Sequence, residues 1–148
     1  MMKKPGLFFF SFLLLSITSF SQIREIPETV KEAFEAQYPA AENVEYNDNL
    51  VNIKVNFILN GEKMVASYNS KGRWKDTEKE WDFEKLTADV KDGFSKSKYA
   101  DWKIIETRIV YMAGGQERYR VKVEKNDVQK KNLFFNKNGR LVEESITI

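Results

Sequence analysis

Apolar and polar side chains alternate along two stretches of this chain, residues 51–59 and 118–124. A period of two is typical of a β-strand with one buried and one solvated face. Asn60-Gly61 follows the first stretch and is a strong signal for a two-residue hairpin, and Asn126-Asp127 is a weaker counterpart after the second. We therefore expect antiparallel strands that share one buried face.

Two other segments have the spacing of helices. Pro27–Gln37 is predicted to be the first helix, because proline suits the first helical turn and Pro39 would end it. The second is expected to start at Phe83 or Leu86 and to end near Lys96. Asp82 and Thr87 are both candidate N-caps, so its start stays open by one turn. The expected apolar faces are Val30 and Phe34 in one helix, and Leu86, Val90 and Phe94 in the other.

The order of these elements repeats along the chain. Val30-Lys31-Glu32-Ala33-Phe34 recurs as Val90-Lys91-Asp92-Gly93-Phe94, and 68–73 recurs as 135–140 with the same Asn-x-x-Gly-Arg turn. Such a repeat predicts two copies of one unit. The expected fold class is α+β, with two tandem repeats, each of one helix and four antiparallel strands. Both would contribute to one sheet with both helices on one face. Repeat one is 25–81 and repeat two is 82–148.

The first 21 residues have the pattern of an export signal. Lys3 and Lys4 precede the apolar run Leu7–Leu15, and Ser19-Phe20-Ser21 places small residues before an expected cleavage at Gln22. The apolar run is shorter than the roughly 20 residues that a membrane-spanning helix needs. We therefore expect a signal peptide over 1–21, a single PepSY-like domain over 22–148, and a periplasmic or secreted protein without a membrane anchor.

Removal of this segment changes the charge balance. The whole chain has 24 basic and 22 acidic residues, and Lys3 and Lys4 are the only charged residues of 1–21, which leaves 22 of each. A neutral chain gives no reason to expect nucleic-acid binding, which requires a basic surface. The chain has no cysteine, so no disulfide supports the fold.

The repeated motifs resemble those of a known family. The helix start Val-Lys-x-x-Phe, the stretch Tyr38–Tyr46 with its counterpart 98–102, and the aromatic-Asn-x-x-Gly-Arg turn occur in the same order in both repeats. In these features residues 25–148 resemble the beta-lactamase-inhibitor-like, PepSY-like family of exported bacterial proteins. The resemblance implies tandem helix-plus-sheet units like those of the beta-lactamase inhibitor protein. It does not imply lactamase inhibition, and the PepSY name suggests a tie to peptidase regulation by fold analogy alone.

Catalytic and metal-binding chemistry find little support in the residue types. Histidine and cysteine are both absent, so Ser-His and Cys-His pairs cannot form, and the usual zinc ligands are lacking. Carboxylates at Asp76, Glu78 and Glu80, and at Glu143 and Glu144, are more typical of a solvated strand face. We expect no enzyme and no cofactor.

The remaining candidates for function are aromatic and polar residues of the predicted sheet. Trp74 and Trp81 are seven residues apart, so they should point to opposite faces unless a bulge intervenes. The predicted partner-contact residues are Trp74, Trp81, Tyr46, Tyr111, Lys54 and Arg120. The leading hypothesis is a non-catalytic exported protein-binding module, an inhibitor or regulator of an envelope enzyme. The alternative is a small-molecule or metal-binding envelope protein related to stress.

Overall fold

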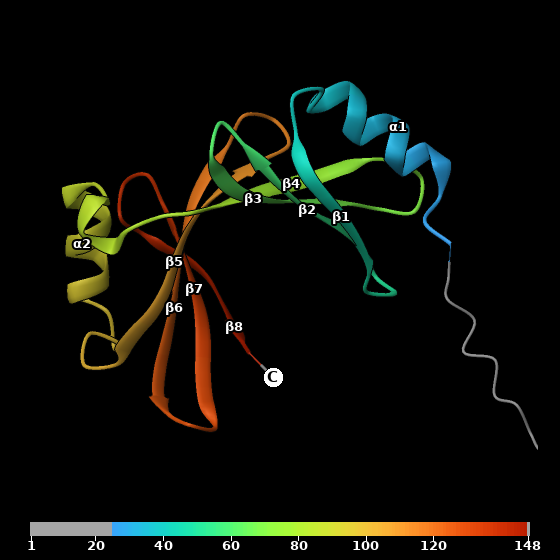
Figure 1. Cartoon of the computed structure of the whole chain (residues 1–148). Coiled ribbons are helices and arrows are strands. Elements are labelled where there is room, and N and C mark those ends of the chain that lie inside the picture. Colours follow the sequence, from blue (N-terminus) through green and yellow to red (C-terminus); the bar gives the residue numbers. More distant parts are fainter. Residues whose placement is uncertain (1–24, 148) are drawn as a thin grey trace, which may run out of the picture.

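The computed structural model describes residues 25–147, so the predicted signal peptide over 1–21 lies outside the described residues. Within that range the chain forms one eight-stranded antiparallel sheet in the order β1 to β8, with two α-helices (Figure 1). The helices are α1 (Glu28–Gln37) and α2 (Ala88–Ser95). The strands are β1 (Glu42–Asp48), β2 (Ile53–Leu59), β3 (Glu62–Tyr68), β4 (Trp74–Glu80), β5 (Lys103–Met112), β6 (Glu117–Asn126), β7 (Gln129–Asn136) and β8 (Leu141–Ile146).

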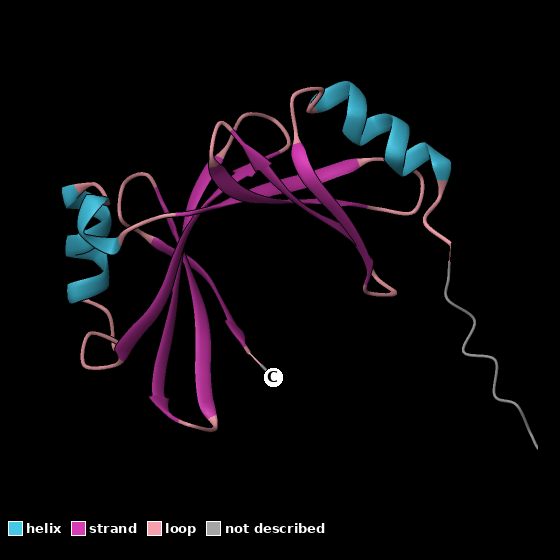
Figure 2. Ribbon diagram, in the orientation of Figure 1, coloured by secondary structure: helices cyan, strands magenta, loops and turns pink. Residues whose placement is uncertain are grey.

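The sheet bends into an arch, and both helices lie on its outer, convex side (Figure 2). This confirms the predicted α+β class with both helices on one face of one sheet. The order helix, then four strands, occurs twice, which is compatible with the predicted repeat, whose boundaries stay a prediction. None of the described helices is long and apolar enough to cross a membrane.

Each helix covers its own hydrophobic cluster. Val30 and Phe34 of α1 are buried with residues of β2 and β3, and Val90 and Phe94 of α2 with residues of β5, β6 and β7. The sheet is continuous, but its core is divided in two. Thr77 on β4 and Thr107 on β5 are buried polar residues on the central strands where the halves join.

The uncertain start of the second helix has a structural explanation, because both candidate caps are used. The Asp82 carboxylate accepts the Glu84 N–H at 3.0 Å at the head of a short 3-10 turn, Phe83–Lys85. The Thr87 hydroxyl accepts the Val90 N–H at 3.4 Å at the head of α2. Leu86 lies between them in an extended conformation, which separates two short helical elements.

Close backbone contacts attach the helices to the turns that follow β3 and β7. A Cβ at Gly93 of α2 would lie 1.8 Å from the Gly139 carbonyl oxygen, and one at Gly72 would lie 2.4 Å from the Thr29 carbonyl oxygen. These turns are the two copies of the repeated Asn-x-x-Gly-Arg motif. Their glycines therefore also set how closely each helix approaches the sheet.

One strand prediction is wrong at its start. The alternation 51–59 places Val51 among the buried residues, but β2 begins at Ile53 and Val51 is 79% exposed. The reason is that Leu50 has a positive φ of 67°, which turns the chain before the strand begins.

Candidate functional site: the open face of the sheet

The concave face of the sheet carries no helix. Alternation along each strand points one set of side chains toward the helices and the other set into the arch. We call the latter surface the open face. Lys54, Ser67 and Asp76 lie side by side on it, in register across β2, β3 and β4. Two of the predicted contact residues, Lys54 and Arg120, belong to this face.

A network of four charged side chains occupies the centre of the open face. An Arg120 amino group (Nη2) lies 2.9 Å from Glu78 and 2.7 Å from Glu106. Arg108 contacts Glu106 and lies 3.5 Å from Glu78. Arg108 and Arg120 are directly opposite each other on β5 and β6, a repulsive arrangement that the two glutamates compensate. The network therefore fixes four side chains at the join between the halves.

The members of this network are largely shielded from water. Their side chains are between 16% and 31% exposed, with Arg120 the least and Glu106 the most. Burial raises the pKa of Glu106, but the positive charges of Arg108 and Arg120 outweigh it, so the pKa is lowered. The Glu106 carboxylate is thus held ionised between the two arginines.

A shallow hollow of about 300 Å³ lies beside the network. Ile58 on β2 and Val65 on β3 contribute apolar side chains to it, because both alternate onto the open face. Lys63, Glu80 and Arg108 also line it. The open face therefore combines a small apolar depression with charges of both signs, a composition typical of the rim and core of a protein interface.

The four predicted aromatic contacts lie on the helix-covered face instead. Trp74 and Tyr46 pack against the cluster under α1, and Trp81 and Tyr111 pack against the cluster under α2. All four are half-buried. They contribute to the two hydrophobic clusters, and their role as partner contacts stays a prediction.

A bulge explains why Trp74 and Trp81 share a face. Ser67 pairs with Asp76 but its neighbour Tyr68 pairs with Trp74, so Lys75 is an extra residue in β4. The extra residue reverses the alternation between the two tryptophans. The Trp74 Nε1–H then donates to the Thr77 hydroxyl at 2.9 Å, which is also 2.7 Å from the Tyr38 hydroxyl. A buried polar group on the central strand is thereby satisfied.

Three of the five carboxylates considered for acid–base chemistry have close structural partners. Glu78 belongs to the network, Glu143 pairs with Arg118 at 3.0 Å, and Glu144 accepts from the Tyr99 hydroxyl at 2.6 Å. Among residues 25–147 no group of three or more potential metal ligands is assembled. The arrangement of these acids therefore points to ion pairing within the sheet.

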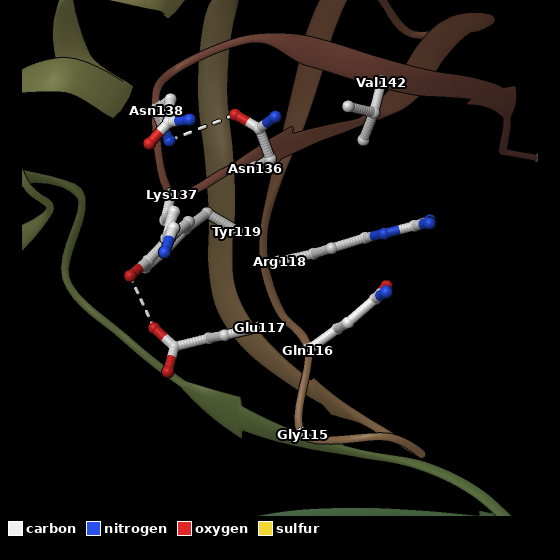
Figure 3. Close-up of a pocket in the computed structure, with 9 residues that line it drawn as sticks. All are labelled: Gly115, Gln116, Glu117, Arg118, Tyr119, Asn136, Lys137, Asn138 and Val142. Carbon is white, nitrogen blue, oxygen red and sulfur yellow. Dashed lines mark hydrogen bonds between the residues drawn. The ribbon is translucent and has the colours of Figure 1, made fainter.

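A cavity of about 730 Å³ lies at the end of the sheet between the β5–β6 and β7–β8 turns. Its lining side chains do not converge (Figure 3): Glu117 and Tyr119 point to one side of β6, whereas Gln116 and Arg118 point to the other. The Tyr119 hydroxyl donates a hydrogen bond to the Glu117 carboxylate, and this contact raises the pKa of Tyr119 to about 12. The cavity is a gap between two turns and lacks the convergent polar groups of a ligand site.

Both edges of the sheet are irregular. β1 has an extra residue between Glu42 and Glu45, and β8 has one at Val142, where Phe134 pairs with Glu143 and Phe135 with Leu141. Bulges and acidic residues at edges disfavour the pairing of a further strand. The open face, rather than an edge, is thus the surface best suited to a partner.

No family model and no curated protein matches this chain. Several crystal structures have the same fold. A DUF2874 family protein from Bacteroides ovatus is 26% identical, with a TM-score of 0.72 over 83% of this chain and 89% of that chain. A candidate periplasmic protein from Bacteroides eggerthii is 19% identical, with a TM-score of 0.71 over 83% of this chain and 90% of that one.

A third structure bears on the resemblance inferred from the repeated motifs. A BLIP-like protein from Bacteroides fragilis (BLIP denotes beta-lactamase inhibitor protein) is 20% identical, with a TM-score of 0.70 over 85% of this chain and 89% of that chain. The PepSY part of the resemblance stays a prediction. The chain has the fold of this BLIP-like protein, which confirms the fold implied by its resemblance to the beta-lactamase-inhibitor-like family.

Proposed function

We propose that this protein is a non-catalytic exported module that binds a protein partner in the bacterial envelope through the open face of its sheet, as an inhibitor or regulator of that partner. The observation that carries the proposal is the placement of both helices on the convex side, which leaves the concave side of the sheet free. A concave sheet face with fixed charges can bind a convex surface of another protein.

The charge pattern of the open face supports a protein as the partner. The four charged groups of the network neutralise one another in pairs before any partner arrives. Such pre-paired charges favour selectivity and register more than affinity. The nearby hollow with Ile58 and Val65 offers apolar contact, so affinity would come from there and from the rest of the arch.

The proposed location and the lack of catalysis have separate support. The predicted signal peptide indicates export, and one structure with the same fold is a candidate periplasmic protein, so we place the protein in the periplasm. The absence of histidine and cysteine removes the commonest nucleophile–base pairs. The BLIP-like neighbour adds an analogy with an inhibitor, at the level of fold alone.

Lys54 and Arg120 are the predicted contact residues that this proposal uses. Arg120 is part of the network, so its replacement would also disturb the fold. Lys54 is half-buried on the open face, and its opposite neighbours Ser67 and Asn47 are uncharged. It is therefore the better site for a charge reversal.

The test immobilises the chain from residue 22 and exposes it to envelope extract of the source bacterium over a range of salt concentrations. A retained protein is purified and its affinity measured for Lys54→Glu and for Lys71→Glu, a matched reversal on the exposed turn beneath α1. We expect Lys54→Glu to weaken binding about fivefold to tenfold and Lys71→Glu to leave it unchanged. Equal effects of the two substitutions, or no protein retained above background, would overturn the proposal.

A further inference from the structure

The loop between β1 and β2 departs from what its sequence pattern predicts. Leu50 is 83% exposed and Val51 is 79% exposed, although the alternation along 51–59 places Val51 in the core. Two adjacent large apolar side chains at the tip of a loop are in contact mainly with water. Positions where a sequence breaks its own local rules are frequently functional.

The backbone of this loop is strained as well as exposed. Leu50 has a φ of 67°, in the left-handed region that side chains other than Gly, Asn and Asp rarely adopt. The conformation is held by hydrogen bonds: the Asp48 carboxylate accepts the Leu50 N–H at 2.8 Å, and the Asn49 carbonyl accepts the Val51 N–H at 2.8 Å. An asparagine or glycine would fit the backbone better. The apolar side chain is therefore kept at a cost in stability.

The base of the loop is also fixed. The Asn49 N–H donates to the Asn52 carbonyl at 3.0 Å, and the Lys75 ammonium donates to the Asn52 side chain at 2.8 Å from across the sheet. Lys75 is the bulge residue of β4. The two apolar side chains are thus presented on a constrained turn, which lowers the conformational entropy lost on binding.

The loop lies at the mouth of the arch, at the free end of the first half of the sheet (Figure 1). Across the mouth, the second half ends with two further exposed apolar residues, Val128 at 85% and Ile146 at 74% exposure. The exposed apolar residues of these two loops therefore lie at the two ends of the arch, whereas Ile146, which pairs with Lys131, is on the helix-covered face. A protein seated in the arch would meet them at its margins.

We infer that Leu50 and Val51 form an apolar anchor that inserts into an apolar pocket of the protein bound on the open face. This inference rests on the proposed function and adds a contact outside the concave surface. Uncharged Asn49 and Asn52 flank the pair, so its insertion desolvates no charge on residues 49–52. The loop offers no lysine or arginine of its own for anionic lipid, which favours a protein pocket over a membrane surface.

The test uses Leu50→Asn and Leu50→Met in the chain from residue 22, with the purified partner from the extract. Asparagine tolerates the left-handed turn, so Leu50→Asn should keep or raise the melting temperature, while methionine keeps an apolar side chain of similar size. We expect Leu50→Asn to weaken binding at least about tenfold, as removal of a buried leucine contact should, and Leu50→Met to stay within about threefold. If Leu50→Asn binds the partner protein with wild-type affinity, the proposed apolar anchor is wrong.

The outcomes separate this inference from the proposed function. Loss of binding in Lys54→Glu together with normal binding in Leu50→Asn keeps the open face as the interface and removes the anchor. If only Leu50→Asn loses binding to the partner, the anchor is supported and the open face is rejected as the interface. A second arm measures binding to vesicles of phosphatidylglycerol and phosphatidylethanolamine and the oligomeric state of the chain. If Leu50→Asn changes vesicle binding or self-association but not the affinity for the partner protein, the loop serves that other contact and the inference is wrong.

Discussion

The contact between α2 and the β7–β8 turn makes a sharp prediction for Gly93→Ala. Gly93 lies inside α2, where alanine should be favoured over glycine by about 1 kcal/mol on helix propensity alone. In the folded protein, however, the added Cβ would lie 1.8 Å from the Gly139 carbonyl oxygen and 2.7 Å from its carbonyl carbon. Both obstructing atoms are backbone, so no side-chain rotation relieves the clash.

The two effects have opposite signs and can be compared. Overpacking of a well-packed contact costs typically about 1–3 kcal/mol, and a backbone obstacle places this case at the upper end. After the gain in propensity, we expect Gly93→Ala to lower the free energy of unfolding by about 2 kcal/mol. Either α2 or the turn would have to move outward, which loosens Val90 and Phe94 in the core beneath it.

Urea unfolding followed by circular dichroism and tryptophan fluorescence measures this free energy. The change from Glu32→Ala to Glu32→Gly, at an exposed position in the middle of α1, is the control, because it reports the helix propensity difference without a close neighbouring turn. It should destabilise by about 1 kcal/mol. If Gly93→Ala instead stabilised the protein by a similar amount, propensity would dominate and the close contact between helix and turn would not exist as described.

Three further predictions follow from buried contacts. Phe34→Ala and Phe94→Ala should each cost about 3–5 kcal/mol, the usual range for a buried phenylalanine, and unfolding should stay a single transition; two transitions, each sensitive to one substitution, would show independent halves. Thr77→Val removes the partner of two side-chain hydrogen bonds and should cost about 1–3 kcal/mol, measured by urea unfolding. The folded-state pKa of Glu106 is lowered, so its contribution to the free energy of unfolding is present above the unfolded-state pKa and is lost as pH falls through the folded-state pKa. Glu106→Gln should therefore flatten the acid side of a curve of stability against pH. An unchanged curve would refute this.

The sequence pattern predicts the secondary structure and the buried face well, and it fails where a single residue breaks the period. Alternation cannot reveal the bulge at Lys75, because a bulge depends on how the neighbouring strand pairs. For the same reason Trp74 and Trp81 could not be assigned to faces. The positive φ at Leu50 is equally hidden, since leucine carries no local signal for it.

The open face could be predicted only in part. Alternation predicts that Lys54 and Arg120 lie on the solvated face of their strands, and both lie on the open face. The network of which Arg120 is a member was not predictable, because Glu78, Glu106 and Arg108 come from β4 and β5, and their register across β6 sets which charges meet. A sequence gives the two faces of each strand, but the neighbours on a face follow from pairing.

The join between the halves has a consequence for assembly. If β5 is the counterpart of β1, the β4–β5 ladder pairs the last strand of one unit with the first strand of the next, from Asp76 opposite Met112 to Glu80 opposite Arg108. A fragment of residues 82–148 expressed alone would expose the edge of β5 that pairs with β4 in the whole chain. It would still carry β8, its own equivalent of β4. Copies could then pair head to tail, a contact that does not close on itself and grows into fibres. In the whole chain β1 ends at Asp48. Under the same correspondence it lacks the segment that forms this ladder in β5, so we expect the first unit to act as a terminal cap that stops polymerisation.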